Sequence, residues 1–167
     1  MKLLSLLFLL TLSCQATERV LILDGRNNHD WIRTTKALKD TLSATGLFEV
    51  EVSTAPEDKA GPAPRRPKVE DEAYLKAKAE HQARVKSLKP DLDARWADWD
   101  IDFSSYKAVI LNYNGPGWPP AMKENFVKYV KNGGGVLLVH AANNGFSNWT
   151  EFNNMIGLGW RKGGFGK

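Results

Sequence analysis

Three segments of the chain each run from an apolar stretch directly into a cluster of polar and aromatic residues. They span residues 20–31, 109–118 and 136–144. A short, continuous apolar run of this kind is typical of a buried strand in a parallel sheet. The carboxyl ends of parallel strands meet at one edge of the sheet, and open α/β proteins bind ligands outside that edge. We therefore expect the three polar clusters to converge on one pocket.

The intervals between these segments carry helix and strand patterns. Residues 31–45 place apolar side chains near helical spacing and are followed by Gly46, which predicts a helix and its end. Residues 48–52 alternate apolar and polar, which predicts a half-exposed strand toward the edge of the sheet. Further helices are predicted after Pro119 and over residues 149–156. The alternation of strands and helices indicates an α/β fold with three α/β/α layers and a mainly parallel sheet.

A charged stretch at about residues 57–100 interrupts this pattern. Its proline-rich start favours neither a helix nor a strand ladder, whereas residues 70–87 are rich in good helix formers. We interpret it as a surface insertion with a solvated helix, in which His81 is a plain surface histidine.

The chain begins with features of an export signal. Lys2 precedes an apolar run over residues 3–12, and Cys14 and Ala16 are small enough for the positions before a signal peptidase cut. We expect residues 1–16 to be a signal peptide, residues 17–167 to form one domain, and the protein to be periplasmic or secreted. A lipoprotein anchored through Cys14 is the alternative. No segment reaches the roughly 20 apolar residues of a membrane span.

Composition excludes several classes of function. Cys14 is the single cysteine, so a protein cleaved after residue 16 has no thiol nucleophile and cannot be a cysteine-dependent amidotransferase. The net charge of +4 comes from interspersed charges rather than a basic stripe, so we expect no nucleic-acid partner. The sequence does not define the oligomeric state.

Two histidines are the main candidates for chemistry. His140 directly follows the run 136–139, at a strand-to-loop junction where some α/β folds place a nucleophile on a tight turn. His29 lies in the loop after the first predicted strand. Histidine serves as a general acid or base near neutral pH, as a metal ligand, or as a structural hydrogen-bonding group. We expect His140 to act as acid or base, with His29 and Asp24 assisting.

The loops around these histidines are rich in asparagines and aromatic residues. Asparagine offers both a donor and an acceptor, and aromatic rings offer flat apolar faces, which together suit a sugar. For any single residue, a role in a turn or in the core is the favoured interpretation, and only the clustering of these residues supports a sugar site. The candidate substrate-binding residues are Asn27, Asn28, Trp31, Asn112, Tyr113, Asn114, Trp118, Asn143, Asn144 and Trp149.

A metal site stays an open alternative. The two histidines could bind a divalent metal together with Asp24 or Asp30, but no compact ligand spacing identifies a third ligand. No cofactor is assigned with certainty.

Three motifs in order resemble the ThuA-like, or trehalose-utilisation, family. They are residues 21–31, residues 111–119, and residues 133–144 with Trp149. The resemblance implies a flavodoxin-like fold similar to class I glutamine amidotransferases, with His140 where those enzymes place their cysteine. It also implies a role in the utilisation of trehalose, another glycoside or a keto-sugar.

Members of this family usually continue past the equivalent of Trp160, so we expect the chain to be C-terminally truncated relative to them. Because of that departure, a non-catalytic sugar-binding domain or an inactive fragment is the alternative to an enzyme.

Overall fold

The sheet is built around strand β1 (Glu18–Asp24), which has a parallel neighbour on each side. In the computed structural model, which describes residues 16–159, four parallel strands are arranged in the order β2-β1-β3-β4. The other strands are β2 (Phe48–Thr54), β3 (Ala108–Leu111) and β4 (Gly135–Leu138). This is the flavodoxin-like order, so the predicted fold class is confirmed. The proposed signal peptide lies outside the described residues except for Ala16.

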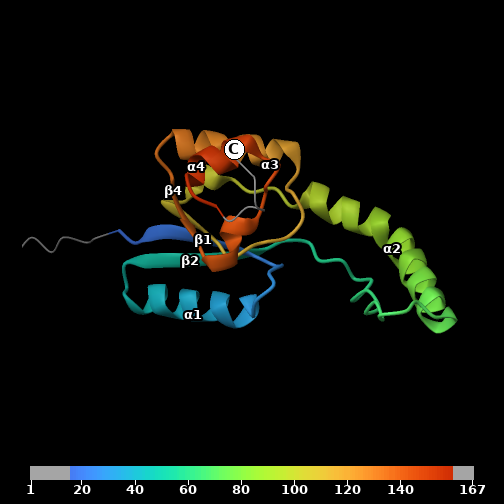
Figure 1. Cartoon of the computed structure of the whole chain (residues 1–167). Coiled ribbons are helices and arrows are strands. Elements are labelled where there is room, and N and C mark those ends of the chain that lie inside the picture. The colour runs from blue at the N-terminus through green and yellow to red at the C-terminus, as the bar shows by residue number, and fades with distance from the viewer. Residues whose placement is uncertain (1–15, 160–167) are drawn as a thin grey trace, which may run out of the picture.

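Helices cover the two faces of the sheet unequally (Figure 1). Helix α1 (Trp31–Ala44) lies on one face, and helices α3 (Pro120–Lys131) and α4 (Thr150–Ile156) lie on the other. The helices predicted over residues 31–45, after Pro119 and over residues 149–156 are therefore confirmed. Leu137 on β4 stays 51% exposed, because α1 packs along β1 and β2 rather than along β4.

The core on the α3 and α4 side is mainly aromatic. Phe103 belongs to a short 3-10 turn (Phe103–Ser105) before β3 and stacks on Trp118, with its ring edge-on to Phe126. Trp149 and Phe152 extend the same cluster toward α4. These rings are nearly inaccessible to solvent and supply most of the large apolar surface buried on this face. On the α1 side the core is smaller and aliphatic, built from Val20, Ile22, Val50 and Ile110.

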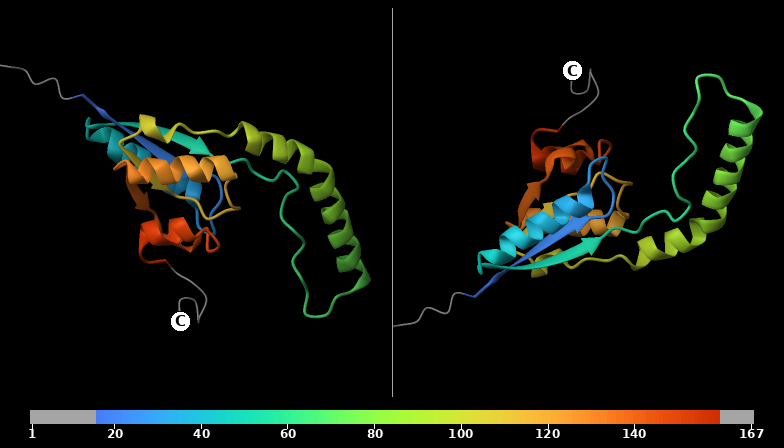
Figure 2. Two further views of the ribbon diagram at one scale, coloured as in Figure 1. Left: turned by 90° about the horizontal axis from the view of Figure 1, so that it is seen from above. Right: turned by 90° about the horizontal axis from the view of Figure 1, so that it is seen from below.

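The predicted insertion forms an arm that leaves the sheet beyond the end of β2 (Figure 2). We use "the arm" for the extended segment 56–71 and helix α2 (Glu72–Asp98). The helix is longer than the predicted 70–87 and passes through Pro90, and none of its residues is buried. Within residues 16–159, no helix has the length and apolar composition to cross a membrane.

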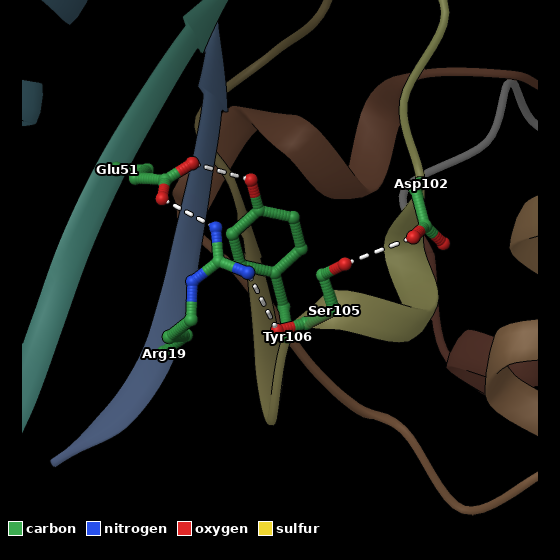
Figure 3. Close-up of polar contacts among 5 residues, drawn as sticks. All are labelled: Arg19, Glu51, Asp102, Ser105 and Tyr106. Atoms are coloured by element: carbon green, nitrogen blue, oxygen red, sulfur yellow. Dashed lines mark hydrogen bonds and ion pairs between the residues drawn. The ribbon is translucent and has the colours of Figure 1, made fainter.

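Side chains near the amino ends of β1 and β3 form a polar cluster with Glu51 from the middle of β2 (Figure 3). Arg19 on β1 donates to the Glu51 carboxylate at 2.5 Å, and the Tyr106 hydroxyl donates to its other oxygen at 2.5 Å. The hydrogen bond from Arg19, followed by that from Tyr106, lowers the pKa of Glu51. The cluster joins β1, β2 and the start of β3 at the end of the sheet opposite the predicted site.

We expect Phe103→Ala to lower the free energy of unfolding by about 3–5 kcal/mol, because the cavity left between three aromatic rings cannot close fully. Urea denaturation measures this loss. The matched control is Leu158→Ala, at a position that is 84% exposed, and its effect should stay within about 0.5 kcal/mol. Equal effects of the two substitutions would contradict the aromatic core.

The Glu51 cluster predicts a pH dependence of stability. A carboxyl group with a lowered pKa in the folded state stabilises the fold above its unfolded value of about 4.3, and this contribution is lost as the pH falls through the folded pKa. Glu51→Gln should therefore lower Tm near neutral pH and flatten the decline of Tm between about pH 5 and pH 3. Tyr106→Phe should give an intermediate profile. An unchanged acid profile in Glu51→Gln would refute this role.

Candidate functional site

Gly25, the first residue of the loop after β1, packs closely against Ala55 in the segment after β2. Gly25 has φ +121°, and a Cβ there would lie 2.7 Å from the Ala55 backbone nitrogen, so only glycine fits. Asp24, directly before it, is 2% exposed and accepts a hydrogen bond from Thr54 Oγ1 at 2.7 Å. The Asp24 carboxylate thus joins β1 to β2 and faces the protein interior.

Asparagines hold the loops after β1 and β3 together. Asn112, buried at the end of β3, donates through Nδ2 to the Trp31 carbonyl and to Thr35 Oγ1, both at 3.0 Å, and its Oδ1 accepts from Asn27 Nδ2 at 3.3 Å. Its amide is therefore engaged in fixing the start of α1. Asn112 is a structural link in this arrangement and is not available to a sugar hydroxyl.

The next asparagine extends this link toward solvent. The Asn114 backbone nitrogen donates to the Arg26 carbonyl at 2.7 Å, and Asn114 Nδ2 donates to Asn28 Oδ1 at 3.5 Å. Asn28 is exposed and Asn114 half-buried, so both amides border the open end of the sheet. From β1 the chain crosses to β2 on one side, and from β3 it crosses to β4 on the other side. The open end between β1 and β3 is therefore the switch point where flavodoxin-like folds bind ligands.

The two candidate histidines meet at this end of the sheet. The ring centroids of His29 and His140 are 4.6 Å apart with an interplanar angle of 50°, and both residues are exposed. His140 begins a 3-10 turn (His140–Asn144) and has φ +43°, a left-handed conformation that costs a non-glycine residue about 1–2 kcal/mol. Strained backbone of this kind concentrates at functional sites.

Neighbours of the histidine pair divide into structural and accessible groups. Asp30 accepts a hydrogen bond from the Arg33 backbone nitrogen at 3.1 Å and caps α1, so its carboxylate has a structural role. Asn143 and Asn144 are half-buried, and with His140 they line a shallow depression of about 270 Å³.

Three of the predicted sugar-stacking rings lie in the core instead. Tyr113 is 1% exposed, Trp118 is 3% exposed and Trp149 is 7% exposed, so none offers a free face to a ligand. Tyr113 donates its hydroxyl to the Pro116 carbonyl at 2.7 Å, and burial raises its pKa. The rings turn inward because the space between the sheet and helices α3 and α4 is filled by aromatic side chains.

A larger cavity, of about 550 Å³, lies between the loop after β1 and the arm. We call it the arm cavity. The loop contributes Arg26, Asn27 and Trp31, and the segment after β2 contributes Glu57 and Asp58. Helix α2 contributes His81 and Trp96. Because the sequence predicts a surface insertion for the whole arm, Glu57, Asp58, His81 and Trp96 are missed there as candidate site residues. The two tryptophans at 96 and 99 in a charge-rich stretch were a signal of contact with the domain.

No group of three or more His, Cys, Asp or Glu side chains within residues 16–159 is arranged to hold a metal ion. Asp24 and Asp30, the carboxylates considered as metal ligands beside the histidines, are both used in the hydrogen bonds described above.

Together, the parallel sheet and the polar residues that follow its strands define an α/β protein with a candidate site at the flavodoxin-like switch point. A crystal structure from Parabacteroides merdae, of a protein described as ThuA-like, matches the chain with a TM-score of 0.64 and 31% sequence identity. The match covers 88% of this chain and 40% of that protein, so the chain spans about 40% of its length. No protein-family model and no curated protein matches the chain. The similarity supports the ThuA-like resemblance, and the wider relation to glutamine amidotransferases stays a prediction.

The backbone at His140 predicts an unusual order of stabilities. Because glycine adopts a positive φ without steric cost, His140→Gly should be more stable than His140→Ala by about 1 kcal/mol. At Ala37, an exposed position inside α1, Ala37→Gly should instead cost about 1 kcal/mol. Urea denaturation of the three variants and the wild type tests both statements. An alanine variant at 140 more stable than the glycine variant would contradict the left-handed turn.

Proposed function

We propose that the chain is a ThuA-like carbohydrate-processing domain in which His140, with His29 beside it, transfers protons to and from a bound sugar. The contact between the two histidine rings at the carboxyl ends of the strands is the observation that carries this proposal. The positive φ of His140 and the similarity to a ThuA-like protein support it.

Histidine suits this role because its side chain gains and loses a proton near neutral pH. A general acid or base must lie within hydrogen-bond reach of the reacting atom, and both rings are exposed at the same surface. Asn28, Asn114 and Asn144 border that surface and can donate to and accept from hydroxyl groups. The proposed substrate is trehalose, another glycoside, or a keto derivative of one.

A non-catalytic sugar-binding domain is the second candidate. One observation favours it: Asp24, the carboxylate expected to assist the histidines, is buried and bonded to Thr54. An orienting carboxylate is a common partner of a catalytic histidine, and Asp24 does not supply one here. This candidate expects binding of the same sugars without turnover.

We also propose that the protein is exported to the periplasm or secreted. Lys2, the apolar run over residues 3–12 and the small residues Cys14 and Ala16 support this proposal. Mass spectrometry of the protein after expression in a bacterial host tests it. Cleavage after Ala16 is expected, whereas an acylated Cys14 at the amino terminus would establish the lipoprotein alternative.

The catalytic assignment predicts the effect of single substitutions. We expect His140→Ala and His29→Ala each to lower turnover of trehalose or its keto derivative by about 100-fold or more, because a positioned acid or base contributes that much. Product formation is followed by ¹H NMR, with equal Tm values as a check on folding.

The control is Lys36→Ala, an exposed residue of α1 that pairs with Asp40, and it should retain the wild-type rate. Wild-type rates in both histidine variants would refute the acid–base assignment. Binding without turnover by the wild-type protein would establish the second candidate.

A further inference from the structure

The arm cavity borders the loop after β1, which also carries one member of the histidine pair. Its volume of about 550 Å³ lies within the range of small-molecule sites, roughly 300–1,000 Å³. The loop over residues 25–30 borders the cavity through Arg26 and Asn27 and also carries His29. One loop therefore links the arm cavity to the histidine pair.

Contacts within the arm and at its base hold the walls of the cavity in place. Trp99 Nε1 donates to Ser53 Oγ at 2.8 Å, and Arg95 Nη2 donates to the Glu57 carbonyl at 2.9 Å. Further along the arm, His81 Nε2 lies 3.0 Å from the Gly61 carbonyl oxygen. The first contact joins the residue after helix α2 to β2, and the other two join α2 to the segment after β2. The walls are therefore in place before a ligand arrives.

Trp96 is supported from behind by the aromatic core. Its ring packs edge-on against Trp99 with a centroid distance of 5.2 Å, and Trp99 packs in the same way against the buried Trp118 at 6.3 Å. Trp96 is half-buried, and Trp31, the first residue of α1 and also part of the lining, is half-buried as well. The cavity thus has two tryptophans in its lining, one from the arm and one from the start of α1.

The polar groups of the walls carry both signs of charge. Glu57 and Asp58 supply carboxylates, and Arg26 supplies a guanidinium group. Walls of mixed charge favour no strongly anionic or cationic ligand, whereas carboxylates and guanidinium groups make strong hydrogen bonds to hydroxyls. Aromatic faces combined with such groups match a neutral sugar ring, which has apolar C–H faces and a rim of hydroxyls.

We propose that the arm cavity is the subsite for the second, non-reacting sugar ring of a glycoside, with Trp96 and Trp31 against its faces and Glu57 and Asp58 on its hydroxyls. The inference rests on the proposed function, because the first ring is the one that reaches His140. The arm then selects glycosides of two or more rings over single sugars.

The test compares ligands of one and two rings by isothermal titration calorimetry on the full chain. The probes are trehalose, maltose and cellobiose against methyl α- and β-glucopyranosides. Trp96→Ala should weaken binding of the preferred disaccharide at least about tenfold, and Glu57→Ala, in an exposed part of the arm, about threefold. Neither should change methyl glucoside affinity by more than about twofold. The matched aromatic control is Tyr74→Ala, which lies on α2 away from the cavity and should leave both affinities unchanged.

The outcomes separate this inference from the proposed function. Wild-type disaccharide affinity in both Trp96→Ala and Glu57→Ala would overturn the subsite, and loss of turnover in His140→Ala would still support the proposed function. Disaccharide binding that needs Trp96, with turnover unchanged in His140→Ala, would support the subsite and overturn the histidine chemistry. Failure of the wild-type protein to bind any of the five probes would overturn the subsite.

Discussion

The pairing of β1 with parallel neighbours on both sides is the constraint on which the rest of the structure depends. Residues Leu21–Asp24 are almost inaccessible to solvent, so every backbone hydrogen bond of this strand must be satisfied inside the sheet. Because β2 lies on one side of β1 and β3 on the other, the connection from β1 through α1 and the connection from β3 through α3 run in opposite directions along the sheet. The crevice at the carboxyl end of β1 follows from that arrangement, and the loops of residues 25–30 and 112–118 have to meet there.

Contacts between these loops convert the crevice into a site of defined shape. Asn112 uses its amide to link Asn27, Trp31 and Thr35, which ties the loop after β1 to the end of β3. The rings of His29 and His140 are also in contact at this end of the sheet. His140 follows β4 and has a left-handed backbone conformation. A buried asparagine thus fixes the framework, and the exposed residues above it remain available for a ligand.

The strands and helices could be predicted from the sequence because their signals are local. The continuous apolar run of β1, the alternation in β2 and the prolines before α3 each specify one element, and parallel strand ends imply convergence of the loops after them. The direction of individual side chains could not be predicted in this way. Trp118 and Trp149 follow strand ends, as a ligand-binding ring would, but the space beneath α3 and α4 draws them inward.

The contacts and the cavity of the arm could not be predicted for a different reason. Helix α2 has no buried side chain and no apolar stripe of helical period, so its sequence indicates a solvated helix and nothing more. Its contact with the domain depends on Trp99, the residue directly after the helix, which donates to Ser53 and packs against Trp118 in distant parts of the chain. Such contacts become visible only when the tertiary structure is known.

Direct contact between His29 and His140 is the central claim of this account, and an NMR experiment measures it most directly. The chain has three histidines, so selective isotope labelling of histidine gives three ring systems that single substitutions can assign. The ring centroids lie 4.6 Å apart, which predicts nuclear Overhauser effects between the rings of His29 and His140. The ring of His81, which contacts Gly61 within the arm, should show no such effect to His29 or His140. Absence of the effect between His29 and His140 in the folded protein would contradict the convergence of the loops and the site built on it.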